Sequence, residues 1–195
     1  TRATMDTLDY SGSSLNEGSK LLWAAAGEPL RRLAVEMPEL CSLPEGFGDV
    51  LLFAPGIVVC RGPKHNAPRG GQDAAMHSLA ERLGGCLSAR DNPQASTPLA
   101  LLDPEIALIV VVDDAKFTCA SWDNFLWTAF TRSDPATDIY GVREFIHSKH
   151  WGCTGPLIMD SRMKAFHAPP LEEDPEVEKR IDEWGARGGP LHGLI

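Results

Sequence analysis

The stretch from Ile106 to Asp114, IALIVVVDD, constrains the fold of this chain more than any other segment. A continuous run of aliphatic and β-branched residues that stops at two carboxylates is typical of a strand buried on both faces. Such strands belong to sheets that helices cover on either side. In open α/β sheets, sites tend to lie at the carboxyl ends of these strands. The roles of Asp113 and Asp114 are therefore the first question.

Further segments with strand patterns lie on both sides of this run. These short apolar runs, bounded by Gly, Pro or Asp, are Lys20–Ala26, Val50–Phe53, Ile57–Cys60, Ile139–Val142 and Pro156–Met159. Their short length and their turn-rich boundaries predict strands of one sheet.

Two helices are expected among these strands. The first spans Asp73–Leu83, with Asp73 as the N-cap, and Gly84-Gly85 would end it. The second spans Trp122–Arg132 after the cap Ser121. Its expected apolar face consists of Phe125, Leu126, Ala129 and Phe130. The order of elements predicts an α/β fold, a three-layer-like domain with a mixed central sheet flanked by helices.

The chain divides into three regions. Residues 1–18 are polar and predict an N-terminal arm, residues 19–165 hold the α/β domain, and residues 166–195 hold an extended link and a C-terminal helix. This helix is expected to begin after Asp174, with Pro175 at its first position, and to end near Ala186. Its narrow apolar stripe, Val177, Ile181 and Trp184, predicts docking on a neighbouring surface such as another subunit.

Charge and composition exclude several classes of protein. A formal net charge of -9 argues against a nucleic-acid-binding surface, which needs a basic patch. No apolar window is long enough to span a membrane. The five cysteines are an odd number without a C-x-x-C pair, and they are Cys41, Cys60, Cys86, Cys119 and Cys153. We therefore expect reduced thiols in a cytoplasmic protein.

Two loops carry charged or chemically capable side chains. Arg61–Gly71 is the most basic stretch, and it is either a solvated loop or a contact for an acidic partner or anionic ligand. The segment His147–Gly155, HSKHWGCTG, is expected to be a loop. Its H-x-x-H-x-x-C spacing could place His147, His150 and Cys153 on zinc. The alternatives are a loop that lines a pocket or interface, and a loop with no role.

The sequence contains none of the usual catalytic templates. It lacks a G-x-G-x-x-G loop, an H-E-x-x-H pair and a G-x-S-x-G elbow. Asp113 and Asp114 are neighbours in a strand, so their side chains point to opposite sides and cannot face one site. We expect one of them to cap the next element, and we assign no catalytic residue.

Three motifs in order resemble the C-terminal domain of the UbiD family of decarboxylases, which use prenylated flavin mononucleotide. They are VVVDD, then WDNFLWTAFTRSDPATD, then GPLIMDSRMK followed by APP. The residues that match in type and spacing are Trp127, Ala129, Thr131, Arg132, Pro135, Asp138, Asp160, Arg162 and Lys164. The acidic run departs from the family pattern, because Ala115, Lys116 and Phe117 follow the two aspartates.

The resemblance covers the back third of such an enzyme without its catalytic part. It therefore implies a larger UbiD-like partner subunit that holds the prenylated flavin, a divalent metal and a potassium ion, in a hetero-oligomer. The implied reaction is the (de)carboxylation of an aromatic or α,β-unsaturated carboxylic acid. By position, this chain would line the substrate with His147, Ser148, His150 and Trp151, as a lid. Val177, Ile181 and Trp184 would make oligomer contacts.

Other interpretations stay open at this point. The chain is a separate small subunit, a fragment or a repurposed domain. In the last case it would be a non-catalytic assembly or regulatory module. A metal-dependent enzyme built on His147, His150 and Cys153 is a third possibility.

Overall fold

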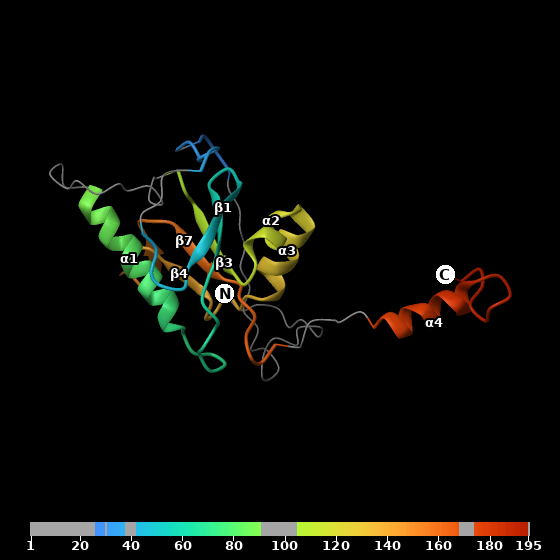
Figure 1. Cartoon of the computed structure of the whole chain (residues 1–195). Helices are drawn as coiled ribbons and strands as arrows, with labels where there is room; N and C mark the ends of the chain where they lie inside the picture. The colour runs from blue at the N-terminus through green and yellow to red at the C-terminus, as the bar shows by residue number, and fades with distance from the viewer. Residues whose placement is uncertain (1–25, 30, 38–41, 91–104, 168–173, 195) are drawn as a thin grey trace.

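The computed structural model describes residues 26–29, 31–37, 42–90, 105–167 and 174–194. A mixed sheet forms the centre of the molecule, with α1 on one face and α2 and α3 on the other (Figure 1). The predicted α/β class with a flanked mixed sheet is confirmed. The predicted arm, residues 1–18, and nearly all of the predicted strand Lys20–Ala26 lie outside the described residues. The division into three regions stays a prediction.

Five strands make up the central sheet, in the order β1-β2-β3-β7-β4. They are β1 (Gly48–Ala54), β2 (Ile57–Arg61), β3 (Leu108–Val112), β4 (Ile139–Gly141) and β7 (Leu157–Asp160). β2, β3 and β7 are parallel, whereas β1 and β4 are antiparallel edge strands. Each predicted strand among the described residues is confirmed, and all five residues of β3 are buried.

Alternate residues of the parallel strands build two separate cores. Val58, Ile109 and Ile158 pack with Met76, Leu79 and Leu83 of α1 (Ala74–Arg90). Val59, Val110 and Met159 pack on the opposite face with Phe125 and Ala129 of α3 (Trp122–Thr131). This two-sided burial explains why β3 is a continuous apolar run.

Two helical predictions need correction. α1 does not end at Gly84-Gly85 but continues to Arg90. Each glycine only lowers the helix propensity, by about 1 kcal/mol, and removes no backbone hydrogen bond, so the pair does not by itself end a helix. In α3, Leu126 and Phe130 were predicted to be buried, but both are exposed. Thr128, which was not predicted to be buried, lies in the interior. The short helix α2 (Ala115–Cys119) was not predicted.

The segment expected to be a loop forms a small β-hairpin. Its strands are β5 (Glu144–His147) and β6 (His150–Cys153), which pair with each other in a sheet of their own. Ser148 and Lys149 form the turn with φ angles of 48° and 67°. Two positive φ values match the twist of a two-residue hairpin turn, although the usual Asn-Gly signal is missing. The loop prediction was therefore wrong.

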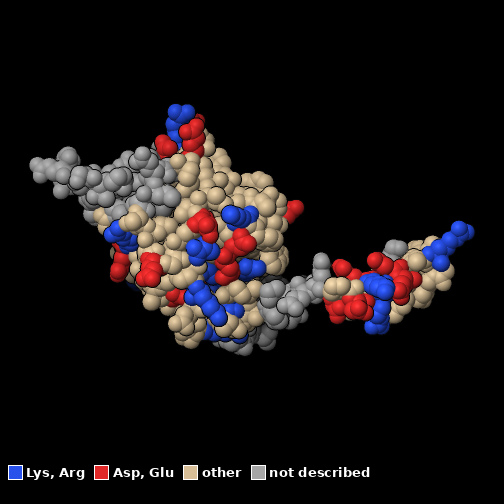
Figure 2. Space-filling model, in the orientation of Figure 1, with Lys and Arg blue, Asp and Glu red and all other residues tan. Residues whose placement is uncertain are grey.

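The C-terminal helix α4 (Pro175–Gly185) is confirmed, with Asp174 as its cap and Pro175 at its start. It has no buried residue, and it lies apart from the sheet in Figure 1. Figure 2 shows acidic and basic side chains gathered on it, while charges of both signs intermingle on the visible face of the α/β body. None of the described helices combines the length and apolar character that crossing a membrane requires.

Candidate functional site

Buried charges meet at the carboxyl ends of the parallel strands, where α/β proteins commonly place their sites. We call Asp73, Asp138, Asp160, Arg162 and Lys164 the carboxyl-end cluster; all five are buried. Arg162 donates from Nε and Nη2 to the two carboxylate oxygens of Asp160, at 2.8 and 2.7 Å. Its Nη2 also lies 3.2 Å from Oδ2 of Asp73, the N-cap of α1. One guanidinium therefore joins the end of β7 to the start of α1.

Lys164 forms the second centre of this cluster. Its Nζ lies 3.0 Å from Oδ2 of Asp138 and donates to the carbonyl oxygens of Arg132 and Asp160, at 2.6 and 2.9 Å. The same Asp138 oxygen accepts a hydrogen bond from the backbone N–H of Asp134 at 2.6 Å. The ammonium group thus holds the end of α3, the turn after it and the end of β7 together.

The two aspartates after β3 have separate tasks. Asp114 caps α2 by accepting a hydrogen bond from the backbone N–H of Phe117 at 2.9 Å, as expected for one of the pair. Asp113 accepts from the backbone N–H of Met163 at 2.7 Å and pairs with Nη1 of Arg132 at 3.2 Å. Both tasks fix local structure, and neither gathers the two carboxylates on one site.

The basic stretch Arg61–Gly71 is tied to its own domain. The carbonyl oxygen of Pro63 accepts from Nη1 of Arg162 at 2.7 Å, and the backbone N–H of Asn66 donates to Asp73 at 2.9 Å. Arg61 pairs with Asp49 at 2.8 Å, and Arg69 lies 5.8 Å from the centre of the Phe166 ring. These contacts favour a structural role for two of its cations over a free anion-binding loop.

The electrostatics of the cluster favour stability over reactivity. Burial alone would lower the pKa of Arg162, but Asp160 and Asp73 outweigh burial and raise it. Burial would raise the pKa of Asp73, but backbone N–H groups and the nearby cations lower it below its usual range. Burial raises the pKa of Asp138 despite its partner Lys164. The cationic groups of the cluster are therefore already neutralised by internal partners, which leaves them unsuited to bind a substrate carboxylate.

The residues expected to line a substrate lie elsewhere, on the β5–β6 hairpin. His147, Ser148, His150 and Trp151 are all exposed there. His147 lies opposite His150 in the register, next to the turn, and Trp151 lies opposite Ile146. The hairpin rests on the sheet through Gly141, where an added Cβ would lie 2.5 Å from Cβ of Cys153. The four predicted residues thus share one projecting element, away from the carboxyl-end cluster.

The hairpin geometry removes the zinc alternative. His147 and His150 share one face of the hairpin, whereas Cys153 lies on the opposite face because successive side chains alternate. The Cys153 thiol donates to the carbonyl oxygen of Gly155 at 3.3 Å. Within the described part of the chain, no three His, Cys, Asp or Glu side chains are arranged to hold a metal ion. Cys60, Cys119 and Cys153 are free thiols, as expected.

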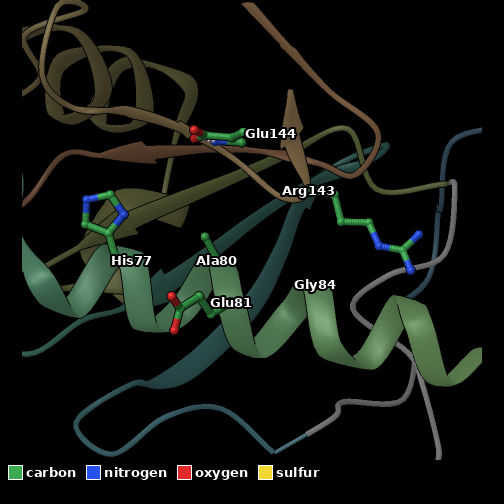
Figure 3. A pocket seen from close by; sticks show the side chains of 7 residues that line it. His77, Ala80, Glu81, Gly84, Arg143 and Glu144 are labelled. Carbon is green, nitrogen blue, oxygen red and sulfur yellow. Dashed lines mark hydrogen bonds between the residues drawn. The ribbon is translucent and has the colours of Figure 1, made fainter. Parts of the chain in front are cut away.

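A cavity of about 310 Å³ lies between α1 and the start of the hairpin. It is lined by His77, Ala80, Glu81, Gly84, Gly141, Arg143 and Glu144. Figure 3 shows His77, Ala80, Glu81 and Gly84 along the helix, across from Arg143 and Glu144. Sequence reasoning missed this cavity, although the spacing of His77 and Glu81 places both on one face of the helix. Two of these polar groups already have internal partners, because His77 contacts Gln72 and Glu144 accepts from the backbone of Gly141.

Comparison with known proteins finds distant relatives of this chain. No family model matches the chain. It is 27% identical over 186 residues to a 4-hydroxybenzoate decarboxylase subunit of Chlamydia pneumoniae, a match that covers 93% of this chain and 26% of that protein. A protein of Chlamydia trachomatis serovar D is 30% identical over 184 residues, which covers 90% of this chain and 26% of the relative.

The comparison with solved structures also found a partial match. It is the vanillic acid decarboxylase of Sedimentibacter hydroxybenzoicus, with 18% identity and a TM-score of 0.35 over 65% of this chain and 26% of that one. This chain is distantly similar to UbiD-family aromatic acid decarboxylases. It spans about a quarter of the length of the curated relatives that it matches.

The motif residues now have a physical explanation. Asp138, Asp160, Arg162 and Lys164, which carry the resemblance to UbiD enzymes, are four of the five members of the carboxyl-end cluster. Their types and spacing are those that this network of buried ion pairs requires. Prenylated flavin needs cations or metal ions for its phosphate, and the cations of this cluster are bound internally. The residues of the carboxyl-end cluster therefore do not fit the phosphate of this cofactor, and we assign no step of a flavin reaction to them.

Proposed function

We propose that this chain works as the C-terminal part of a UbiD-like carboxy-lyase that acts on an aromatic or α,β-unsaturated carboxylic acid. A larger UbiD-like partner subunit would hold the prenylated flavin with its divalent metal and potassium ion, and would supply the acid and base groups. The observation that carries the proposal is the similarity to the chlamydial 4-hydroxybenzoate decarboxylase subunit over 93% of this chain. The internal neutralisation of the carboxyl-end cluster supports a partner-held cofactor.

The β5–β6 hairpin would be the part that reaches the partner's substrate pocket. It presents His147, Ser148, His150 and Trp151 on an exposed element, and its base packs on Gly141 of the central sheet. A hairpin with a packed base and an exposed tip suits a lid that excludes water from a reaction centre. The stripe Val177, Ile181 and Trp184 of α4, which is unburied, would contribute oligomer contacts.

Co-purification tests the assembly. The chain, tagged in its native host, should recover a larger flavin-containing protein, and the pair should release carbon dioxide from 4-hydroxybenzoate or a related acid. Recovery of this chain without such a protein would contradict the proposal.

Two substitutions test the hairpin. Trp151→Ala and His150→Ala should each lower the activity of the complex about tenfold or more, as expected for groups that orient substrate or exclude water. His192→Ala, at an exposed histidine outside the hairpin, is the matched control and should leave activity unchanged. Circular dichroism and co-elution with the partner would show that the variants still fold and assemble.

A non-catalytic assembly or regulatory module of the same fold is the second candidate. The saturation of the buried charges by one another favours it, because the cluster serves structure without an open site. In that case, both hairpin variants would retain full activity, while omission of the chain would still change the activity or the assembly of the partner.

A further inference from the structure

One side of the β5–β6 hairpin is attached to the central sheet. The register and the alternation of side chains place four residues on this side, which we call the inner face: Glu144, Ile146, Trp151 and Cys153. An added Cβ at Gly141 of β4 would lie 2.5 Å from Cβ of Cys153 and 3.0 Å from Cζ2 of Trp151. The Glu144 carboxylate accepts a hydrogen bond from the backbone N–H of Gly141 at 2.6 Å. The inner face therefore fixes the hairpin to the α/β body.

The opposite side of the hairpin, the outer face, carries an aromatic ring and two imidazoles. Its members are Phe145, His147, His150 and Gly152, of which the first three are exposed. Phe145 lies opposite Gly152 in the register, and the far edge of its ring covers this glycine. An added Cβ at Gly152 would lie 2.7 Å from Cζ of the ring. The missing side chain of Gly152 thus leaves the space that the ring occupies.

The side chains of the outer face match the parts of an aromatic acid. His147 and His150 are direct cross-strand neighbours, and such neighbours have Cβ atoms about 4.5–5.5 Å apart. An imidazole N–H donates hydrogen bonds to carboxylate and hydroxyl oxygens. An aromatic ring such as that of Phe145 attracts a second ring at about 4.5–7 Å between the ring centres. A planar ring that bears a carboxylate therefore complements this face.

We infer that the outer face contacts the substrate, with Phe145 selecting an aromatic ring while His147 and His150 bind its polar substituents. Trp151 is then a positioning residue, which acts by holding the hairpin against Gly141. Phe145 is not among the residues predicted to line the substrate. The inference rests on the proposed function, and it specifies which side of the hairpin faces the reaction centre.

The inner face is less suitable for an acidic substrate. It is turned towards α1, since Glu144 and Gly141 also line the cavity between α1 and the hairpin. Trp151 and Cys153 are already in contact with the sheet on this side. The carboxylate of Glu144 adds a negative charge there, which repels a substrate carboxylate.

The binding of two acids of similar size to the complex of this chain with its flavin-containing partner tests the inference. Benzoate has an aromatic ring and cyclohexanecarboxylate a saturated one, and equilibrium dialysis gives a Kd for each. Phe145→Leu, which removes the ring but keeps an apolar side chain, should reduce the preference for benzoate about three- to tenfold. Gly152→Ala should reduce it in the same direction, because the added Cβ displaces the Phe145 ring.

Three further variants separate the two faces. Ile146→Ala changes the adjacent residue on the inner face and is the matched control, which should leave the preference for benzoate unchanged. His147→Ala should weaken the binding of both acids to a similar extent, because both have a carboxylate. Trp151→Phe keeps a ring against Gly141, so the complex should retain a kcat that Trp151→Ala lowers.

The outcomes distinguish this inference from the proposed function. A wild-type complex that decarboxylates an aromatic acid, but whose preference for benzoate does not change in Phe145→Leu, would overturn the inference alone. A complex that neither binds benzoate nor releases carbon dioxide from an aromatic acid would overturn both. If Ile146→Ala reduces the preference as much as Phe145→Leu does, the inner face contacts the substrate and the inference is wrong.

Discussion

Arg162, just after β7, and Asp73, at the start of α1, form an ion pair of 3.2 Å in the interior of the domain. The guanidinium also binds Asp160 through two hydrogen bonds and the carbonyl oxygen of Pro63 through a third. A single fully buried side chain therefore connects a strand, a helix and the basic loop. We therefore expect the stability of the domain to depend on this connection more than on the exposed ion pair of Arg61 with Asp49.

Replacement of Arg162 by methionine should be severely destabilising. Arg162→Met leaves the buried carboxylates of Asp160 and Asp73 without their shared cation, which should lower the free energy of unfolding by about 3–5 kcal/mol. Urea denaturation followed by circular dichroism would measure the loss. Arg61→Met is the control, since it breaks an exposed pair with Asp49 and should cost less than about 1 kcal/mol. Equal losses in the two variants would show that the buried network contributes little.

Asp73 should make the domain sensitive to acid. Its pKa is lowered from the ordinary value of 3.8, so ionised Asp73 stabilises the fold above pH 3.8, and this contribution is lost as the pH falls through the lower folded-state value. Asp73→Asn keeps an acceptor for the helix cap but removes the charge. The difference in unfolding free energy between wild type and this variant should therefore be constant above pH 3.8 and shrink below it.

Asp138 should show the opposite behaviour in a different pH range. Burial raises its pKa above 3.8, so the folded state takes up a proton before the unfolded state as the pH falls. Relative to Asp138→Asn, the wild-type protein should gain stability as the pH falls from that raised value to pH 3.8. Denaturant titrations at closely spaced pH values would separate the two aspartates. The same slope for both variants would contradict the assignment of opposite shifts.

The Cys60 thiol should not react with alkylating reagents in the folded protein. Burial raises the pKa of this thiol to about 12, and the residue is almost fully enclosed. Thiolate is the reactive form, so iodoacetamide at about pH 8 should leave Cys60 unmodified while it labels the half-buried Cys119 and Cys153 slowly. Mass spectrometry of peptides from native and urea-unfolded protein would compare the sites. Labelling of native Cys60 as fast as Cys119 would be inconsistent with this burial.

Alanine at two glycines should have opposite effects on stability. Gly85 lies inside α1, and an added Cβ would meet nothing within 4 Å. Gly85→Ala should therefore raise the free energy of unfolding by about 0.5–1 kcal/mol. Gly62→Ala is the opposing case, because its Cβ would lie 2.5 Å from Cγ1 of Val111 and should cost about 1–3 kcal/mol. Thermal melts would report both changes, and a lower melting temperature for Gly85→Ala would show that α1 does not extend through this position.

The sheet and its flanking helices could be predicted from the sequence, because a strand that is buried on both faces is a continuous apolar run. The run that became β3 is uninterrupted by polar residues, and the caps Asp73, Ser121 and Asp174 all occupy their predicted places. Helix ends were less certain. The pair Gly84-Gly85 favours a helix stop, but α1 continues through it to Arg90.

The β5–β6 hairpin and the carboxyl-end cluster have weaker signals in the sequence. The turn Ser148-Lys149 adopts positive φ angles without the glycine or asparagine that normally signals them, so the segment resembled a loop. The full burial of Arg162 was invisible because its partner Asp73 is remote in sequence and only the fold brings them together. The outward face of α3 was misassigned since apolar residues on both sides of a helix give no indication of which side faces the sheet.

β7 lies between β3 and β4 in the sheet, and this position determines the order in which the strands of a newly synthesised chain can pair. β4 is synthesised before β7, yet among the described strands β7 is its one neighbour, so β4 has no place in the described sheet until residues 157–160 leave the ribosome. Until then, one edge of β3 is open and Asp73 lacks its guanidinium partner. An open, apolar strand edge invites pairing with other chains. A nascent chain stalled before Leu157 should therefore aggregate or recruit chaperones, whereas a few more residues close the sheet and complete its buried ion pairs.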